Sequence, residues 1–387
     1  METLLLPTDY PSKIALLIHS LCGGGAERVV ADLANSWASM GRSVTLVTMT
    51  DSTADRYDVS PEVRRVGLAL DQSSSSFWQA IYNNWRRVRD LRRALRDSGA
   101  EVAISFVDRM NITTLWAAYR LQIPVVVCER TDYRYHSIGD FWNRQRNRWY
   151  PTAATLVVQT DEVAHAARDW LPTVPVEVIP NAVPQSAIQS PPRVHCGDAR
   201  TVTWIGRMAE EKGVVDLIDA FGLVVNKLPD WKLALVGDGP LVDSLKARVD
   251  GLQLGDRVQF YGWQRDLEEI FDRTTIFALP SRYEGFPNVL LECMARGIPA
   301  ISFDCPSGPR AVIRDNVDGV LVPAGDIKQF AAAIVKLATD PGRLEDLGRA
   351  AADVRERFCH EHYLRRWEDV LTKTTGPSAV STERAGH

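Results

Sequence analysis

The chain has 387 residues, of which 45% are hydrophobic and 24% are charged. This length exceeds what one hydrophobic core usually organises, so we expect at least two domains, and the composition excludes a largely disordered chain. The net charge of −4 does not favour nucleic-acid binding.

The first predicted elements are a strand, a glycine-rich turn and a helix. An apolar strand over 13–19 precedes the turn Gly-Gly-Gly-Ala-Glu at 23–27, and a helix over 26–40 follows. This order is the opening of a doubly wound α/β domain. The turn is not the dinucleotide fingerprint, because the third small position of that motif is Arg28. Bare backbone at a helix N-terminus still suits a phosphate or a sugar, and a simple tight turn is the alternative.

The segment 81–96 combines apolar residues at helical spacing with six arginines and one acidic residue, Asp90. It therefore predicts an amphipathic helix with an arginine-rich face. One interpretation of that face is a solvated surface. The other is contact between Arg86, Arg89 and Arg93 and anionic lipid headgroups or an acceptor pyrophosphate, because the planar guanidinium matches phosphate.

Further strands of the first half are predicted over 101–106, 125–128, 156–159 and 176–180. Glu129 and Arg130 come directly after one of these strands. Parallel sheets bind ligands at the carboxyl ends of their strands, so Arg130 is a candidate contact for a donor or an acceptor. A structural ion pair is the alternative interpretation of this residue.

A proline-rich segment over 181–192 separates the two halves, and we interpret it as an interdomain linker. The α/β pattern then restarts with a strand over 201–205. Gly206 and Arg207 follow this strand, and Lys212 precedes the next predicted helix. Two cations beside backbone amides can neutralise a departing diphosphate, and a solvated pair is the alternative.

The most informative stretch follows a predicted apolar strand over 275–280. Glu284 lies on the loop after this strand, and Glu292 lies in the first turns of the next predicted helix. The amides of Asn288 and Val289 are at the N-terminus of that helix, which is a natural anion site. Two carboxylates there would repel phosphate, so we expect them to bind hydroxyls, such as those of a ribose and a sugar. The alternative is a helix with a capping loop.

A glutamate, seven residues and a second glutamate resemble the donor-site signature of retaining glycosyltransferases of family 4. The sequence Gly-Phe-Pro that begins at Gly285, and the sequence Ala-Arg-Gly-Ile-Pro-Ala after the second glutamate, extend the resemblance. In this family the first glutamate holds the transferred sugar and the second bonds the ribose. The resemblance therefore implies these roles for Glu284 and Glu292.

Other motifs resemble the same family. Gly-Arg, four residues and Lys-Gly are similar to its phosphate-binding pair, which implies that role for Arg207 and Lys212. The turn at Gly24 and Gly25 looks like the family's turn whose amides face the donor diphosphate. Trp263 ends a predicted strand after which the family's backbone meets the nucleobase.

One position departs from the family. Many members have Glu-His after the strand predicted over 125–128, and the histidine contacts the transferred sugar. This chain has Arg130 in place of that histidine. The role of a histidine is therefore not carried over, and Arg130 stays a candidate contact.

The resemblance implies the glycosyltransferase B fold, with two Rossmann-like domains facing a cleft. The expected division is an acceptor-binding domain over 1–180, the linker over 181–192, a nucleotide-sugar domain over 193–357, a C-terminal helix over 358–373 that crosses back, and a disordered tail over 374–387. The implied reaction moves a sugar from a nucleotide diphosphate donor, with UDP favoured, to an acceptor hydroxyl with retention. The acceptor expected from the resemblance is a lipid-linked or polysaccharide glycan.

The resemblance needs no protein base, because the departing phosphate oxygen is thought to take the acceptor proton. The sequence has no Asp-x-Asp pair to hold a divalent metal, so we expect a metal-independent enzyme without a cofactor. Two rival functions remain: a sugar-nucleotide epimerase or phosphorylase on the same fold, and a non-catalytic nucleotide-sugar-binding module.

The sequence also restricts where the protein is expected to work. The run Leu4–Leu6 is too short for a signal peptide, and no stretch approaches 18 apolar residues. The six cysteines form no Cys-x-x-Cys pair, which is typical of reduced cytoplasmic proteins. We expect a cytoplasmic protein that can associate with the inner face of the cell membrane.

Overall fold

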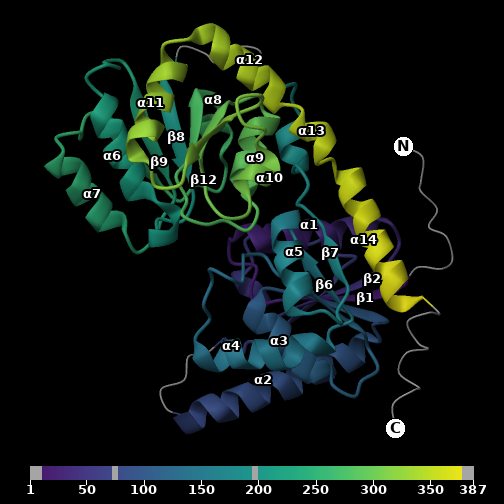
Figure 1. Ribbon diagram of the computed structural model, residues 1–387. Coiled ribbons are helices and arrows are strands. Elements are labelled where there is room, and N and C mark those ends of the chain that lie inside the picture. The colour runs from purple at the N-terminus through teal and green to yellow at the C-terminus, as the bar shows by residue number, and fades with distance from the viewer. Residues whose placement is uncertain (1–10, 72–76, 194–198, 377–387) are drawn as a thin grey trace. The chain divides into compact units, whose positions relative to one another are not determined.

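The computed structural model describes residues 11–71, 77–193 and 199–376 (Figure 1). The chain divides into two compact units. The first unit runs to Ile179 and takes up the chain again from Leu364, and the second unit is Pro180–Tyr363. The predicted linker over 181–192 therefore begins inside the second unit.

The described residues of the first unit form one seven-stranded sheet in the order β3-β2-β1-β4-β5-β6-β7, and the paired strands are parallel. Its strands are β1 (Lys13–Ile18), β2 (Ser43–Thr48), β3 (Arg64–Gly67), β4 (Val102–Phe106), β5 (Val125–Cys128), β6 (Thr155–Val158) and β7 (Val176–Val178). The central strands are buried on both faces, which explains their continuous apolar runs.

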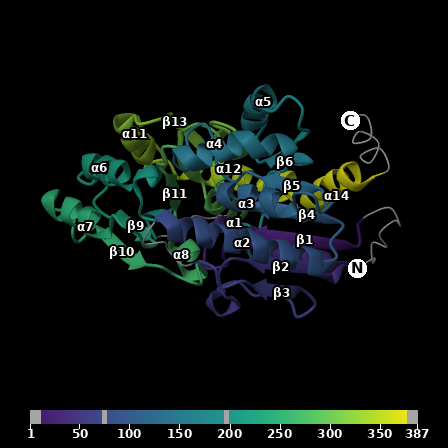
Figure 2. The ribbon, with the colours of Figure 1, turned by 90° about the horizontal axis from the view of Figure 1, so that it is seen from below.

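Helices cover the first sheet. They are α1 (Gly25–Ser39), α2 (Phe77–Ser98), α3 (Asp108–Ala118), α4 (Asp140–Trp149), α5 (Asp161–Trp170) and most of α14 (His360–Thr375). Figure 2 shows α2, α3 and α4 as neighbours, with α3 in the middle. Leu91 and Leu95 of α2 are buried, so this helix packs through the apolar face that its sequence predicts.

The last helix, α14, is anchored in the first unit by a buried aromatic and ionic contact. Trp367 meets Trp37 of α1 edge to face, with ring centroids 5.9 Å apart. Arg42 donates two hydrogen bonds to Glu368, which also accepts one from Trp37 Nε1 at 3.2 Å. Thr374 is buried as well, so the helix continues past the predicted start of the tail at 374. Residues 377–387 of that predicted tail lie outside the described residues.

The described residues of the second unit form one six-stranded parallel sheet in the order β10-β9-β8-β11-β12-β13. Its strands are β8 (Thr201–Ile205), β9 (Lys232–Val236), β10 (Val258–Gly262), β11 (Ile276–Leu279), β12 (Ala300–Asp304) and β13 (Val320–Pro323). This order repeats that of the first sheet without its last strand. Two doubly wound α/β units confirm the predicted fold class.

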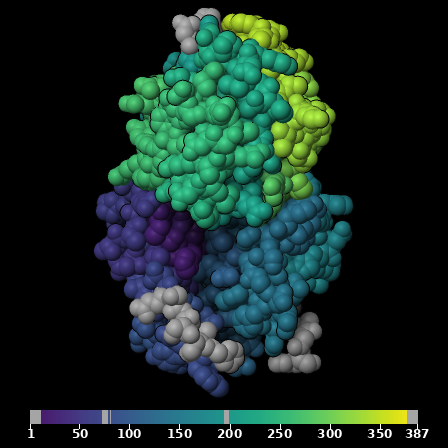
Figure 3. Space-filling view, turned by 90° about the vertical axis from the view of Figure 1, so that its left-hand side faces the viewer, coloured from purple at the N-terminus to yellow at the C-terminus, as the bar shows by residue number. Residues whose placement is uncertain are grey.

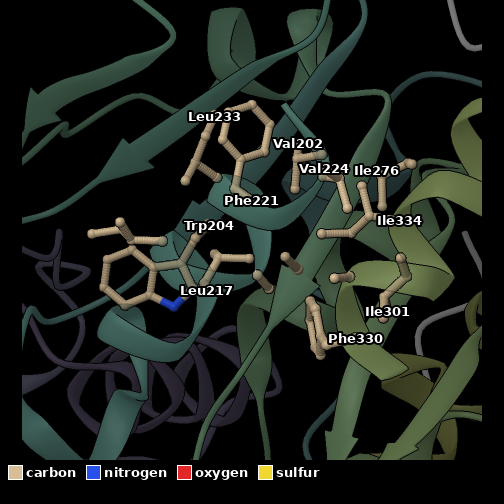
Figure 4. Packing of buried hydrophobic residues seen from close by; sticks show 14 of the residues in the cluster. Val202, Trp204, Leu217, Phe221, Val224, Leu233, Ile276, Ile301, Phe330 and Ile334 are labelled. Carbon is tan, nitrogen blue, oxygen red and sulfur yellow. The ribbon is translucent and has the colours of Figure 1, made fainter. Parts of the chain in front are cut away.

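The helices of the second unit are α6 (Val214–Val224), α7 (Val242–Gly251), α8 (Glu268–Arg273), α9 (Asn288–Ala295), α10 (Pro309–Val312), α11 (Ile327–Ala338), α12 (Pro341–Ala351) and α13 (Val354–Arg357). Figure 4 shows a core in which Trp204, Phe221 and Phe330 pack between the sheet, α6 and α11. The surface formed by α7 and its neighbours is seen in Figure 3. Val183 and Ala187, from the predicted linker, are buried in this unit.

One strand of the first sheet, β3, was not predicted. It has four residues, two of them arginines, and lies at the edge of the sheet. An edge strand buries little of its surface, so it lacks the apolar run by which the central strands are detected.

Candidate active site

The candidate site lies at the carboxyl edge of the second sheet, at the point between β8 and β11 where the strand order reverses. Strand β8 is flanked by β9 on one side and β11 on the other. The loops after β8 and β11 therefore leave the sheet on either side of one crevice, which is where open α/β sheets bind ligands. Arg207 and Lys212 follow β8, and Glu284 follows β11.

The structure brings Lys212 and Glu284 into direct contact. Lys212 Nζ donates a hydrogen bond to Glu284 Oε1 at 2.8 Å, and the two side chains are 27% and 10% exposed. Ser281 Oγ donates to the same oxygen at 2.7 Å, and Ser307 Oγ donates to the Glu284 carbonyl at 2.8 Å. Glu284 is therefore fixed by groups from three different loops.

Two glycines permit this close packing of loops. Gly213 has φ 62°, and a Cβ atom there would lie 1.9 Å from the carbonyl oxygen of Pro280. Gly308 has φ 97°, and its Cβ atom would lie 2.9 Å from Cβ of Glu284. Only glycine tolerates both the backbone angle and the contact at these positions.

Arg207 belongs to the same group of charges. Its Nη2 atom donates to Glu211 Oε1 at 2.5 Å. Burial opposes ionisation of Glu211, but the hydrogen bond and charge of Arg207, a backbone hydrogen bond and the charge of Lys212 together outweigh it and lower the pKa of Glu211. The carbonyl of Glu211 accepts from the Arg282 amide at 2.9 Å, which ties the β8 loop to the β11 loop.

The hydroxyl of Tyr283 lies within the electrostatic influence of the charged residues of the site. Burial raises the pKa of its hydroxyl, and the charges of Glu211, Lys212, Arg207 and Glu284 all act on it. The predicted residues Arg207, Lys212 and Glu284 therefore share one electrostatic environment.

Helix α9 contributes the start of its backbone and a buried carboxylate. Asn288 is the first residue of the helix, and its Oδ1 atom accepts a hydrogen bond from Asn181 Nδ2 at 2.5 Å. Val289 follows it, and Gly285 precedes the helix in the Glu284 loop. Glu292 is 2% exposed, one turn into the helix.

The remaining predicted residues of this unit border the site. Gly206 directly follows β8, and its carbonyl oxygen lies so near Gly237 that a Cβ atom on Gly237 would be 1.8 Å from it. Trp263 follows β10 and has 48% of its surface exposed.

The glycine turn of the first unit has a property that its sequence did not indicate. The carboxylate of Glu27 accepts from the amide of Gly23 at 3.1 Å, from the amide of Gly24 and from Ser20 Oγ. Gly25 begins α1. The chain's own carboxylate thus already binds amides that were predicted to face an anion.

The other predicted residues of the first unit lie on two elements. Arg130 follows β5 and stacks over Phe106, with its guanidinium carbon 5.9 Å from the ring centroid. On α2, Arg86 and Arg89 both pair with Asp90, at 3.8 and 2.7 Å, and Arg93 is exposed.

Sequence reasoning missed several residues that hold the site together: Ser281, Ser307, Glu211, Tyr283 and Asn181. Small polar residues are common in loops, so their types carry no signal. Only the position of Ser281, directly after a buried strand and before Glu284, indicated a place at the carboxyl edge.

Within residues 11–71, 77–193 and 199–376, no three His, Cys, Asp or Glu residues are placed to hold a metal ion. In the same ranges, no helix is both long and apolar enough to span a bilayer.

Two family models cover most of the chain. The model for glycosyltransferase family 4 matches residues 23–186, and the model for glycosyl transferases group 1 matches residues 189–354. The boundary between them falls close to the division into two units at Ile179 and Pro180.

Curated relatives include bacterial enzymes of glycan assembly. An exopolysaccharide phosphotransferase of Streptomyces coelicolor is 33% identical over 79% of this chain, which spans about a third (32%) of that protein's length. A Campylobacter jejuni α-1,4-N-acetyl-D-galactosaminyltransferase, named for a diphosphoundecaprenol-linked acceptor, is 26% identical over 93% of this chain and 98% of its own length.

Solved structures show the same fold. Sucrose-phosphate synthase of Thermosynechococcus elongatus superposes with a TM-score of 0.78 at 20% identity, over 92% of this chain and 97% of its own. HepE of Anabaena, in complex with UDP and glucose, gives 0.76 at 18% identity, over 93% and 99% of the chains. The chain therefore belongs to glycosyltransferase family 4 and has the glycosyltransferase B fold.

Proposed function

We propose that this glycosyltransferase moves a sugar from a nucleoside-diphosphate donor, with UDP favoured, to a hydroxyl of a polysaccharide or lipid-linked glycan. The observation that carries the proposal is the contact of Lys212 with Glu284 between the loops after β8 and β11. It puts a group that neutralises phosphate beside a group that binds hydroxyls.

The proposed division of labour follows from charge. Lys212, Arg207 and the amides at the start of α9 bind the diphosphate and stabilise the charge that develops as it leaves. Glu284 accepts hydrogen bonds from the sugar, and Glu292 binds the ribose. Because Lys212 and Glu284 contact each other, the donor diphosphate competes with Glu284 for the ammonium group.

Retention of configuration and independence of metal ions complete the proposal. The departing phosphate oxygen takes the acceptor proton as the new glycosidic bond forms on the same face. The cations of the second unit stabilise the diphosphate in the place of a divalent metal. The family resemblance supports the first statement, and the absence of an Asp-x-Asp pair in the sequence supports the second.

The donor class can be tested directly. We expect one or more of a panel of UDP- and GDP-sugars to raise the melting temperature of the protein, because a ligand that binds only the folded state stabilises it. The same donor should leave Lys212→Ala much less stabilised. If no donor stabilises the wild type, the proposed site is wrong.

The reaction class is tested with the stabilising donor alone. A transferase releases free sugar slowly, by transfer to water. Conversion of the donor to an epimer would instead establish the rival epimerase. Binding without hydrolysis, and without transfer to any glycoside or diphosphate-linked acceptor, would leave only the non-catalytic module.

An anionic membrane surface is a proposed partner of α2. Trp78, Tyr82 and Trp85 recur at spacings of four and three residues, so they share one face, and they are 77%, 57% and 56% exposed. Arg89 stacks over Trp85, with its guanidinium carbon 5.0 Å from the ring centroid. Exposed aromatic rings beside arginines are typical of helices that lie in the interface of an anionic bilayer.

The partner can be tested with vesicles. We expect the protein to sediment with phosphatidylglycerol vesicles and much less with phosphatidylcholine vesicles. A variant with Trp78, Tyr82 and Trp85 changed to serine should lose this binding. Leu223→Ser, at an exposed apolar position of α6, is the control. Unchanged sedimentation of the triple variant would remove the membrane from the proposal.

A further inference from the structure

A second polar cluster lies at the carboxyl edge of the first sheet. Strand β1 is flanked there by β2 and β4, so the switch in chain direction lies between β1 and β4. Asp108 is the second residue after β4, and Glu129 directly follows β5. Both carboxylates are almost fully buried, at 5% and 2% exposure. By the rule that locates the donor site in the second unit, this edge is also a place for a ligand.

Asp108 is paired with a histidine from the loop after β5. His136 Nε2 lies 3.3 Å from Asp108 Oδ2, and the imidazole is 38% exposed. The hydrogen bond with Asp108 raises the pKa of His136 despite burial, and the charge of Glu129 acts in the same direction. The carboxylate of the pair is therefore buried at the edge of the sheet, and the imidazole is partly exposed at the surface.

The backbone that carries Asp108 is strained. Val107 has φ 73° and ψ 138°, which is an unfavourable conformation for a β-branched residue. Its amide donates to the Cys128 carbonyl at 3.1 Å, and its carbonyl accepts from the Asn111 amide at 2.9 Å. Such strain persists where the surrounding structure fixes it, and it is concentrated at functional sites.

Glu129 is the most deeply buried carboxylate of the cluster, at 2% exposure. Tyr150 donates its hydroxyl proton to Glu129 Oε1 at 2.5 Å, and Asn111 Nδ2 donates to the Tyr150 hydroxyl at 3.0 Å. Burial and the charge of Asp108 raise the pKa of Glu129 to about 7. A carboxyl group that is partly protonated at neutral pH can both donate and accept hydrogen bonds.

The cluster also has unmet hydrogen-bonding capacity. Arg146 of α4 is 6% exposed, and its charge acts on Asp108, Glu129 and His136. Among the residues that the structure describes, Nε and Nη1 of Arg146 and Oδ1 of Asn111 have no hydrogen-bond partner. Buried polar atoms are rarely left in this state, so we expect a water molecule or another polar group to complete the cluster.

We propose that Asp108 and His136 form a hydroxyl-binding site for the acceptor glycan, distinct from the donor residues of the second unit. Nε2 of His136 donates to Asp108, so Nδ1 of the neutral ring accepts a hydrogen bond from a sugar hydroxyl. Asp108 is the positioning residue that fixes the tautomer and the ring plane. This inference rests on the proposed transfer of a sugar to a glycan hydroxyl.

A purely structural role predicts different behaviour. If the Asp108–His136 pair only holds the loop 129–139 in place, removing the pair destabilises the first unit. In that case the affinity for the acceptor does not depend on the protonation of His136. The hydroxyl-binding role requires the neutral imidazole. Acceptor binding should therefore weaken as pH falls through the pKa of His136.

Binding is tested by the ring signals of His136 in nuclear magnetic resonance spectra of the full chain. Methyl glycosides of glucose, galactose, mannose and N-acetylgalactosamine serve as probes at millimolar concentration. We expect at least one to shift the His136 signals and to leave those of His165, an exposed histidine of α5, unchanged. No shift at His136 with any glycoside overturns the proposal, as does an equal shift produced by the donor alone.

Kinetics give a second readout. His136→Gln should raise the acceptor KM about tenfold, which corresponds to the loss of roughly one hydrogen bond from a binding group. Asp108→Asn lowers the pKa of His136, so the acid-side rise in acceptor KM should move to lower pH. His165→Gln is the control. An unchanged acceptor KM and pH profile in His136→Gln contradicts the inference.

The two proposals fail in different ways. If no nucleotide-sugar stabilises the protein, the donor site of the second unit is wrong, whatever His136 does. If donors bind and are hydrolysed but glycosides leave His136 unaffected, the proposed function stands and only the hydroxyl site is wrong.

Discussion

The two units have sheets of the same strand order, but their carboxyl edges carry different chemistry. The second unit pairs an ammonium with a carboxylate, Lys212 with Glu284, on loops held together by close backbone contacts. The first pairs an imidazole with a carboxylate, His136 with Asp108, above the buried Glu129. Strand order determines where a site lies, and the loops determine what it binds.

The helix N-termini at these edges differ in the same way. The amides before α1 are bound by the carboxylate of Glu27. At the start of α9, the Oδ1 atom of Asn288 accepts a hydrogen bond from Asn181 Nδ2. A negative charge already lies at the start of the first helix, which disfavours the binding of another anion there.

Removing the cation of the second unit, Lys212, is expected to have the largest effect on activity. Lys212→Ala should reduce turnover on the order of 10²- to 10³-fold, because an electrostatic contact to a developing charge is lost. Its melting temperature should stay close to that of the wild type. Lys246→Ala, on the exposed face of α7, is the control. Near-normal turnover of Lys212→Ala would separate this residue from the chemistry.

A second variant tests whether close backbone packing holds together the loops at the carboxyl edge of the second sheet. Gly213→Ala should destabilise the protein by at least about 1–3 kcal/mol, because the left-handed backbone angle disfavours a side chain and its Cβ atom meets Pro280. Gly251→Ala places its Cβ atom in open space and should have little effect. Urea unfolding of both variants measures the difference, and equal stabilities would contradict the close approach.

In the first unit, the titration of Glu129 is expected to make the stability of the protein depend on pH. The pKa of Glu129 is about 7 in the folded protein and 4.5 as its ordinary value, so the folded state holds the extra proton between them. Its contribution to stability is therefore largest below 4.5 and is lost as pH rises through about 7. Glu129→Gln does not titrate, so urea unfolding at about pH 5 and about pH 8 should show a smaller decline than in the wild type. Glu269→Gln, in the second unit, should keep the wild-type decline.

The smallest expected effect concerns metal ions. If the cations of the second unit replace a metal at the diphosphate, excess chelator should leave the rate of transfer within about twofold of its normal value. The rate is measured before and after dialysis against the chelator. Loss of activity that Mn²⁺ restores would show that Arg207 and Lys212 are not sufficient.

The fold was predictable from the sequence wherever burial is complete. Strands β5 and β8 begin and end at the predicted residues, because both consist mainly of apolar residues that are buried in the sheet. The edge strand β3 gave no such signal. The inward roles of Arg87 and Arg92, which donate to the carbonyls of Leu70 and Ala117, were also hidden, because arginine on an amphipathic helix is typical of its exposed face.

The candidate site was predictable only where residue type and spacing coincide. Glu284 and Lys212 lie in motifs, so their place at the donor edge could be anticipated, and their catalytic role stays a prediction. Asp108 and His136 are 28 positions apart and belong to no motif. Their contact depends on how the loop after β5 folds over the end of β4, which local sequence patterns do not encode.

The anchoring of α14 on α1 has a consequence for how the chain folds as it is synthesised. The first unit needs Trp367 and Glu368 to cover Trp37 and Arg42, yet these residues are made only after the whole of the second unit. The second unit is continuous in sequence and can fold before them. Trp37 and Arg42 therefore stay uncovered until these residues emerge, and a premature stop shortly before residue 364 would release a protein in which the later-made unit is the better folded one.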